Sequence, residues 1–227
     1  YEILRCLVGS EMCIRDRKIR SEVESEINGL GPEISSEAIK KMFDRLDELQ
    51  EGDILVLAGS IPASMPESMY RDIMKRLADR KLKIAVDATK SLLLNVLPFH
   101  PFVIKPNNHE LGELFNVKIK SKDQAVEYAK KLQEMGAQNV IVSMAGEGAV
   151  FVGDDGSVFQ SEAPKGTVVN SVGAGDSMVA GFVAGWIEKQ DYEHAFRMGI
   201  SAGSASAFSE LLATEAEIRQ VYASIEA

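Results

Sequence analysis

Short apolar runs alternate with longer amphipathic stretches along most of this chain, and this alternation restricts the fold more than any other feature. The runs DILVLAG (53–59), KIAVDA (83–88), PFVIKP (101–106) and NVIVSM (139–144) have the length of strands. The stretches between them carry apolar residues at helical spacing, as in DQAVEYAKKLQEMG (123–136). Strands that alternate with helices predict an α/β fold in which helices cover a mostly parallel sheet.

Four details refine this outline. The nearly continuous apolar run 53–59 is typical of a strand buried on both faces. GAVFVGDDGSVFQ (148–160) predicts a hairpin that turns at Asp154-Asp155-Gly156. Near the start, KIRSEVESEIN (18–28) has period two and predicts one half-exposed strand. Helices are predicted over 36–49, 66–80, 176–189, 192–208 and 215–225.

Composition excludes some classes of function. The 227 residues carry a formal net charge of −9, which argues against binding to duplex nucleic acid. This negative net charge is compatible with binding of an anionic small molecule, because amide groups or a metal can hold phosphate on an acidic protein. The longest apolar runs are too short for a membrane span, and no leader peptide is recognisable. We therefore expect a cytoplasmic protein.

The opening segment, residues 1–17, differs from the rest. It holds both cysteines, Cys6 and Cys13, at a spacing that fits no disulfide framework or zinc pattern. It shows neither helical nor strand periodicity, and CLVGSEMCIRD resembles a translated sequencing adapter. Residues 1–17 are therefore predicted to be a non-native segment, with a disordered natural terminus as the alternative.

The stretch VVNSVGAGDSMVAGF (168–182) is the strongest candidate site. Gly173, Ala174 and Gly175 stand directly before Asp176 and an apolar helix. Small residues leave backbone N–H groups bare, and the positive end of a helix attracts phosphate. Asp176 can act there as a base that takes a proton from a substrate hydroxyl. An ordinary Gly-rich turn with Asp176 as helix N-cap fits the spacing equally well.

KPNNHE (105–110) offers a second candidate. Asn107 and Glu110 are three residues apart, so they share one face of a helix start. Their oxygens suit a hydrated magnesium ion, which binds few protein carboxylates. The alternative is a capping box, with Asn107 as the cap and Glu110 at the third helical position.

Two further segments are rich in small residues. In SMAGEGA (143–149), Gly146 and Gly148 would let a nucleotide approach the backbone and Ser143 would donate to a phosphate; a strand-to-hairpin turn is the alternative. In GISAGSASAF (199–208), Gly203 and its neighbours at helical spacing allow close approach of another helix or of an adenine ring. Helix packing is the default interpretation.

Taken in order, AGSIP, KPNNHE, SMAGEGA, VGAGDS and AGSASAFS resemble the ribokinase-like (PfkB-type) sugar kinase family, from about Lys18 to the end. Within the family, INGLGPEIS, LAGSIPASMP and VGAGDSMVAGF are most similar to bacterial 1-phosphofructokinases, followed by tagatose-6-phosphate kinases. The resemblance implies a three-layer α/β fold and phosphorylation of fructose 1-phosphate to fructose 1,6-bisphosphate with ATP and Mg²⁺. It also implies a lid-strand remnant at 18–34 and a kinase domain at 35–227, incomplete at its N-terminus.

The resemblance assigns a role to each candidate. Asp176 would be the base, and Asn107 and Glu110 would organise Mg²⁺. Lys18 would contact the substrate phosphate from the lid, through which two chains can pair as a homodimer. The remaining roles are an anion hole made by Gly173, Ala174 and Gly175, ATP phosphate and ribose contacts from Ser143, Gly146 and Gly148, and an adenine border made by Gly203 and Ser204.

Two departures from the family pattern keep alternatives open. Asn170-Ser171 stand where ribokinases have an Asp-Thr pair that helps to hold a monovalent cation. The family's opening region, which grips the sugar, is absent, so an inactive ATP-binding fragment is an alternative. A Rossmann dinucleotide enzyme is disfavoured, because no strand is followed by G-x-G-x-x-G.

Overall fold

The structure is a computed structural model that describes residues 16–19, 25–28, 33–62 and 64–225. It separates into two compact units. The first comprises Tyr1–Asp53 with Ser60–Leu82, and the second comprises Ile54–Gly59 with Lys83–Ala227. The predicted domain 35–227 is therefore divided between the two units.

The first unit contains a hairpin of β1 (Asp16–Ile19) and β2 (Ser25–Asn28), paired antiparallel. The single strand predicted over 18–28 is therefore wrong, because the chain reverses between its two halves. Strand β1 also includes the last two residues of the segment 1–17, and residues 1–15 lie outside the described residues.

Two helices complete the first unit. Helix α1 (Ser36–Leu46) starts where predicted, because the Ser35 hydroxyl accepts a hydrogen bond from the Ala38 amide at 3.2 Å. Helix α2 (Met69–Leu77) continues into a 3₁₀ turn, η2 (Ala78–Arg80). Arg76 Nε of α2 donates to Asp47 Oδ1 at 2.9 Å, which fastens the end of α1 to α2.

A six-stranded sheet forms the centre of the second unit, in the order β3-β4-β5-β6-β7-β8. The first four strands are parallel and the last two antiparallel, so the mostly parallel sheet is confirmed. Strand β3 is not buried on both faces as predicted; it lies at the edge of the sheet, and Val56 is 45% exposed. The strands are β3 (Ile54–Ala58), β4 (Lys83–Asp87), β5 (Val103–Ile104), β6 (Asn139–Ser143), β7 (Ala149–Val152) and β8 (Val158–Ser161).

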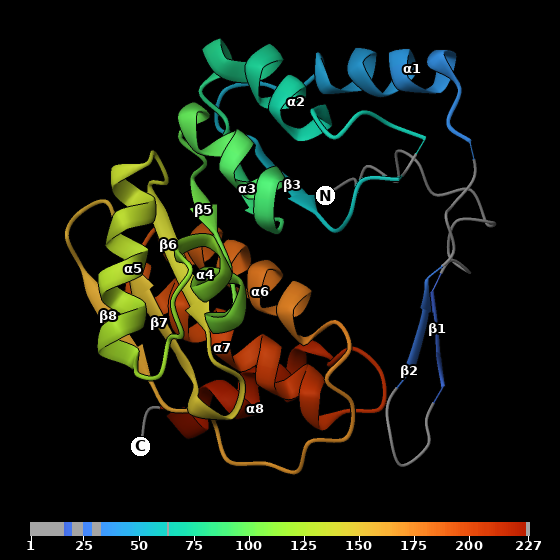
Figure 1. Cartoon of the computed structure of the whole chain (residues 1–227). Helices are drawn as coiled ribbons and strands as arrows, with labels where there is room; N and C mark the ends of the chain where they lie inside the picture. Colours follow the sequence, from blue (N-terminus) through green and yellow to red (C-terminus); the bar gives the residue numbers. More distant parts are fainter. Residues whose placement is uncertain (1–15, 20–24, 29–32, 63, 226–227) are drawn as a thin grey trace. The chain divides into compact units, whose positions relative to one another are not determined.

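Helices cover both faces of this sheet, which gives three layers (Figure 1). One face carries α3 (Lys90–Val96), α4 (Asn108–Phe115) and α5 (Lys122–Glu134). The other carries α6 (Ala174–Lys189) and α7 (Tyr192–Phe208), with α8 (Glu215–Ile225) packed on α7. Apolar side chains of β4 to β7 form the core with α6 and α7, among them Phe102, Phe151, Phe182 and Phe196.

Helices α6 and α7 approach each other closely because glycines line their contact. A Cβ atom at Gly181 would lie 2.6 Å from the Met198 carbonyl oxygen. A Cβ atom at Gly203 would lie 3.0 Å from the Ala174 carbonyl oxygen, at the very start of α6. The default interpretation of GISAGSASAF as a helix-packing surface is therefore confirmed.

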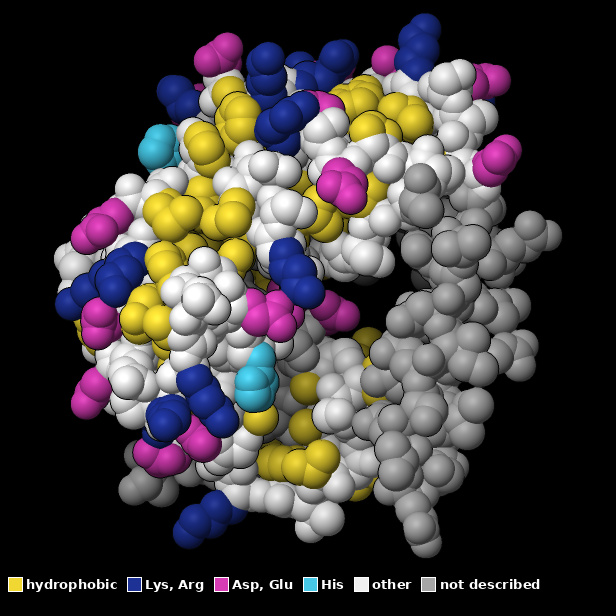
Figure 2. Space-filling model, in the orientation of Figure 1, with side chains coloured by type: hydrophobic (Ala, Val, Ile, Leu, Met, Phe, Trp, Pro, Cys, Tyr) yellow, Lys and Arg dark blue, Asp and Glu magenta, His cyan; other side chains and the backbone are white. Residues whose placement is uncertain are grey.

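The surface is of mixed charge. Acidic and basic side chains are interspersed over the face drawn in Figure 2. Among the described helices, none has the length and apolar character that a membrane crossing requires.

Candidate active site

The carboxyl ends of β4, β5 and β6 meet at one edge of the sheet, because these strands are parallel. Asp87 ends β4, Lys105 follows β5, and Ser143 ends β6. Asn107 forms a parallel bridge with Ser143, so two predicted site residues lie side by side. Ligands in open α/β sheets bind at this edge.

The predicted anion hole is the first turn of α6, and we call residues 173–176 the anion-hole turn. Gly173 is the N-cap and has φ +76°, a left-handed conformation that glycine adopts without strain. Asp176 lies inside the helix and its side chain is exposed. The interpretation of Asp176 as an ordinary N-cap is therefore wrong, since the capping position belongs to Gly173.

Two amides of this turn are available to a ligand. The Ser177 amide donates to the Gly173 carbonyl at 2.8 Å, and the Ala174 amide donates to the Ser171 carbonyl at 3.3 Å. Within the described part of the chain, the amides of Gly175 and Asp176 have no hydrogen-bond partner. They lie at the positive end of a 16-residue helix, where an anion is stabilised.

Lys105 adds a positive charge beside these amides. A Cβ atom at Gly175 would lie only 3.1 Å from Lys105 Nζ, so a larger residue would press on the lysine. The Lys105 side chain is 7% exposed, and its Nζ lies 3.2 Å from Asp87 Oδ2. This ion pair holds the ammonium group next to the anion-hole turn.

Two further carboxylates influence the Asp87 partner of Lys105. Burial raises the pKa of Asp87, and the neighbouring Lys105 opposes that rise. The negative charges of Asp176 and Glu110 raise the pKa of Asp87 further. Asp87 is therefore exposed to the negative charges of Asp176 and Glu110 as well as to the positive charge of Lys105.

Asn107 and Glu110 form the capping box that was the alternative to a metal site. Asn107 Oδ1 accepts from the amides of His109 and Glu110, both at 2.9 Å, and Glu110 Oε2 accepts from the Asn107 amide at 2.8 Å. The second oxygen of Glu110 takes no part in the cap. A magnesium role for this pair stays a prediction, and it depends on that oxygen.

The donors present fit a hydrated magnesium ion better than a fully ligated metal. Among the described residues, no group of three or more His, Cys, Asp or Glu side chains is placed to hold a metal ion. Mg²⁺ usually keeps several waters and binds one or two carboxylates. Glu110 and Asp87 supply two, and they are near enough to each other for the negative charge of Glu110 to raise the pKa of Asp87, which burial raises most.

The remaining predicted residues lie in different surroundings. Gly146 faces open space, since a Cβ atom there would meet nothing within 4 Å. Gly148 has φ +89°, and a Cβ atom there would overlap the Ser161 carbonyl, so the chain itself requires a glycine. Ser204 is half-buried on α7, next to the closely packed Gly203. The nucleotide roles of these four residues and of Ser143 stay predictions.

The structure does not relate Lys18 to this site. Its backbone lies in β1 opposite Glu26, and its side chain is outside the described residues. It belongs to the first unit, whereas all the other candidates belong to the second.

Sequence reasoning missed Asp87 and Lys105. Each directly follows an apolar run that forms a strand, which is the signal that singled out Asn107. Their strands are neighbours in the sheet, so a charged residue of each sign at these two strand ends could have been recognised as an ion pair.

Comparisons with known proteins agree on one family. The pattern described as "pfkB family carbohydrate kinase" matches residues 18–218. The 1-phosphofructokinase of Bacillus subtilis is 48% identical over 204 residues, which cover 90% of this chain and 67% of that protein. The D-tagatose-1-phosphate kinase of Bacillus licheniformis is 32% identical over 209 residues, which cover 92% of this chain and 68% of that protein.

A solved structure extends the similarity to the fold. A crystal structure of a candidate phosphofructokinase from Staphylococcus aureus superimposes with a TM-score of 0.83 at 39% identity. The match covers 92% of this chain and 68% of that one. The chain thus spans about two thirds of the length of these relatives.

Proposed function

The chain belongs to the pfkB family of carbohydrate kinases, and we propose that it transfers phosphate from ATP to a ketose 1-phosphate. The proposed substrate is fructose 1-phosphate and the product is fructose 1,6-bisphosphate. The relative at 48% identity, named a 1-phosphofructokinase, supports this choice. The three-layer α/β fold agrees with that of these kinases.

One observation carries the proposal. The open amides of Gly175 and Asp176, the ammonium group of Lys105 and the exposed Asp176 carboxylate gather at one helix start. Catalysis of phosphoryl transfer mainly requires that the protein position the reactants and stabilise negative charge. Amides and an ammonium group supply the stabilisation, and the carboxylate supplies a base.

The proposed step uses these groups as follows. The free hydroxyl oxygen of the sugar attacks the γ-phosphorus of ATP, and the bond from that phosphorus to the bridging oxygen of ADP breaks. The hydroxyl proton passes to the Asp176 carboxylate. The amides of Gly175 and Asp176 donate to the oxygens of the transferring group, and Lys105 stabilises their charge.

A magnesium ion, when bound, would neutralise part of the charge on the ATP phosphates. Glu110 and Asp87 are the residues that would hold it, through water. The Asp87–Lys105 ion pair also fixes Lys105 in the orientation that the anion-hole turn requires.

Tagatose 1-phosphate is the second candidate substrate. It is favoured over tagatose 6-phosphate because the tagatose relatives are named for the 1-phosphate. Side-by-side kcat/KM values for fructose 1-phosphate, tagatose 1-phosphate and tagatose 6-phosphate decide among them. A preference for either tagatose phosphate would overturn the fructose assignment.

The function is tested by measuring ADP formation from MgATP and fructose 1-phosphate in a coupled assay, together with MgATP binding by calorimetry. Turnover that needs both substrates supports the proposal. Binding of MgATP without turnover would show that this chain is only an ATP-binding part of such a kinase. NADH binding without ATP binding would overturn the kinase proposal altogether.

Two broader features belong to the same proposal. We place the reaction in the cytoplasm, where ATP and sugar phosphates are available. Pairing of two chains through the β1–β2 hairpin is also proposed, and sedimentation of the purified chain tests it.

A further inference from the structure

The loop between α7 and α8, residues 209–214, is fastened to the segment that leads into the anion-hole turn. Asn170 Nδ2 donates to the Glu210 carbonyl oxygen at 3.1 Å. Leu212 lies against Gly173, since a Cβ atom on that glycine would be 2.9 Å from Leu212 Cδ2. A shift of the 209–214 loop would therefore disturb the turn that carries the open amides.

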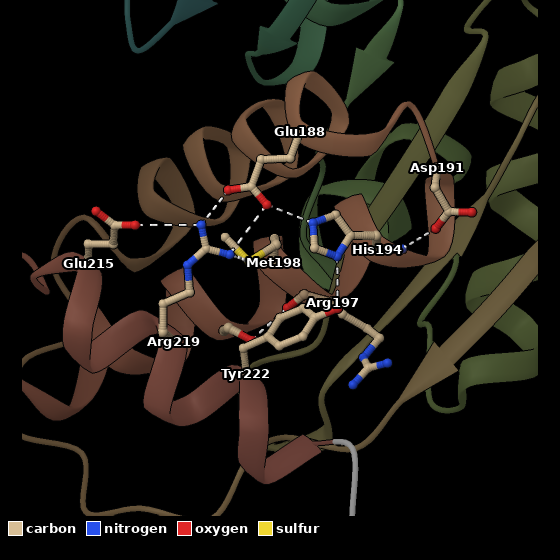
Figure 3. A network of polar contacts seen from close by, with 9 residues as sticks. Glu188, Asp191, His194, Arg197, Met198, Glu215, Arg219 and Tyr222 are labelled. Carbon is tan, nitrogen blue, oxygen red and sulfur yellow. Dashed lines mark hydrogen bonds and ion pairs between the residues drawn. The ribbon is translucent and has the colours of Figure 1, made fainter.

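The far end of this loop is fixed by α8, which a polar network holds against α6 and α7 (Figure 3). The imidazole of His194 on α7 lies between two partners, with Nε2 2.8 Å from Glu188 Oε2 and Nδ1 2.8 Å from Tyr222 Oη. Arg219 of α8 forms an ion pair with the same Glu188 at the end of α6. The loop thus runs from one anchored helix to another.

Between these anchors, the hydroxyl group of Ser206 joins three segments of the chain. Ser206 lies on α7 and is only 2% exposed. Its Oγ donates to Ser177 Oγ on α6 at 2.9 Å and accepts from the Ala213 amide of the 209–214 loop at 3.2 Å. Ser177 directly follows Asp176, so this hydroxyl links the loop to the residue next to the proposed base.

We propose that Ser206 is a positioning residue of the nucleotide site: its hydroxyl keeps the 209–214 loop and the anion-hole turn in one arrangement, in which the amides of Gly175 and Asp176 face the phosphates of ATP. The identity of the ligand rests on the proposed function. Without the hydroxyl, the Ala213 amide and the Ser177 hydroxyl lose a buried partner, and other arrangements become populated. Apparent affinity falls in proportion to the fraction of chains in the competent arrangement.

Ser206→Ala tests this, and Ser201→Ala is its matched control. Ser201 lies on the same helix, is 0% exposed and donates to the Arg197 carbonyl of its own helix at 2.7 Å; within the described residues its hydroxyl forms no hydrogen bond to the loop or to α6. We expect Ser206→Ala to weaken MgATP binding about fivefold or more, to raise the KM for ATP and to lower kcat. We expect the Ser201→Ala chain to match the wild type in all three.

Hydrogen exchange tests the same idea without a nucleotide. In Ser206→Ala, the hydrogen-bonded amides of the two linked regions should exchange at least about fivefold faster than in the wild type: Ala174 and Ser177 at the anion-hole turn, and Ala213 in the loop. In Ser201→Ala they should exchange at the wild-type rate. A general loss of stability would instead accelerate exchange in both regions and in the core strands alike.

Ser177→Ala provides a second, milder variant, because Ser177 is only half-buried. It removes the link to α6 and leaves the bond from Ala213 to Ser206. We expect it to lower kcat, and we expect the double variant Ser177→Ala/Ser206→Ala to lose less than the product of the two single effects, since both changes break the same bond.

The outcomes separate the two proposals. If the wild-type chain binds MgATP and Ser206→Ala binds it equally well, with unchanged exchange in both regions, the positioning role is overturned and the kinase proposal stands. If Ser206→Ala does not fold, Ser177→Ala decides: a Ser177→Ala chain that keeps the wild-type kcat and the wild-type MgATP affinity overturns the positioning role. A wild-type chain that does not bind MgATP overturns both proposals.

Discussion

The ammonium group of Lys105 pairs with a carboxylate and lies beside a turn that would attract an anion. It pairs with Asp87 at the end of the neighbouring strand, and it lies beside the two open amides of the anion-hole turn. A bound phosphate would be a second partner for Lys105, in addition to Asp87. In the sequence, Lys105 stood out only as the first residue of the KPNNHE segment. Its importance comes from Asp87, which ends the neighbouring strand β4 and pairs with it.

We expect Lys105→Met to weaken MgATP binding by about 10- to 100-fold, because a hydrogen bond to a charged group contributes about 1.5–3 kcal/mol. Lys83→Met is the matched control: Lys83 lies at the opposite end of β4, with Nζ 4.5 Å from the Phe102 ring centre. Calorimetry on both variants measures the effect. Equal MgATP affinities in the two variants would show that Lys105 does not contribute to nucleotide binding.

The packed helix pair α6 and α7 supports the candidate site. Their glycines bring Gly203 of α7 close to the Ala174 carbonyl, so the packing of the helix pair reaches the anion-hole turn itself. The same helices enclose the aromatic core over β4 to β7. A change that separates the helices should therefore disturb both stability and the site.

Gly181→Ala tests this packing. The added methyl would lie 2.6 Å from the Met198 carbonyl oxygen. Overpacking of this kind destabilises a protein by about 1–3 kcal/mol. The higher helix propensity of alanine offsets up to about 1 kcal/mol of that loss. We expect a net loss in the free energy of unfolding, measured in urea by the fluorescence of Trp186, the single tryptophan. Gly146→Ala, where the methyl meets open space, should be within about 0.5 kcal/mol of the wild type.

The network that holds α8 makes stability depend on pH. Hydrogen bonds from Arg219 and then from His194 lower the pKa of Glu188 from 4.5 to about 2. A carboxylate with a lowered pKa stabilises the fold above its unfolded pKa and loses that contribution as the pH falls toward the folded value. The stabilisation from Glu188 is therefore complete above about pH 4.5 and disappears between there and about pH 2.

We expect Glu188→Gln to be less stable than the wild type at neutral pH, with a difference that shrinks as the pH falls from about 4.5 to 2. Urea unfolding of both chains across this range, followed through Trp186, measures the difference. A difference that does not change with pH would show that the ion pair with Arg219 contributes nothing.

On the scale of the whole molecule, local signals in the sequence predicted the elements well. Helices α7 and α8 have the predicted bounds, and the hairpin of β7 and β8 turns where Asp154-Asp155-Gly156 predicted it. Caps and turn residues act within a few positions, so a sequence displays them directly. Membership of the family, expected from ordered motifs, was confirmed by the comparisons.

The errors arose where distant segments decide the outcome. Strand β3 has an apolar sequence but lies at an edge of the sheet, because strand order depends on the whole sheet. The period-two pattern of 18–28 continued through a chain reversal that it does not encode. The Asp87–Lys105 pair and the Ser206 link join residues 18 and 29 positions apart along the chain, which no local motif reports.

In the proposed mechanism, the Asp176 carboxylate deprotonates the sugar hydroxyl while the amides beside it hold the transferring phosphoryl group. Steady-state kinetics of Asp176→Asn with MgATP and fructose 1-phosphate, paired with MgATP calorimetry, test it most directly. We expect kcat to fall by about 10²- to 10⁴-fold, the range typical for a general base, while MgATP affinity stays within about threefold of the wild type. An Asp176→Asn chain that keeps a tenth or more of the wild-type kcat would contradict the claim.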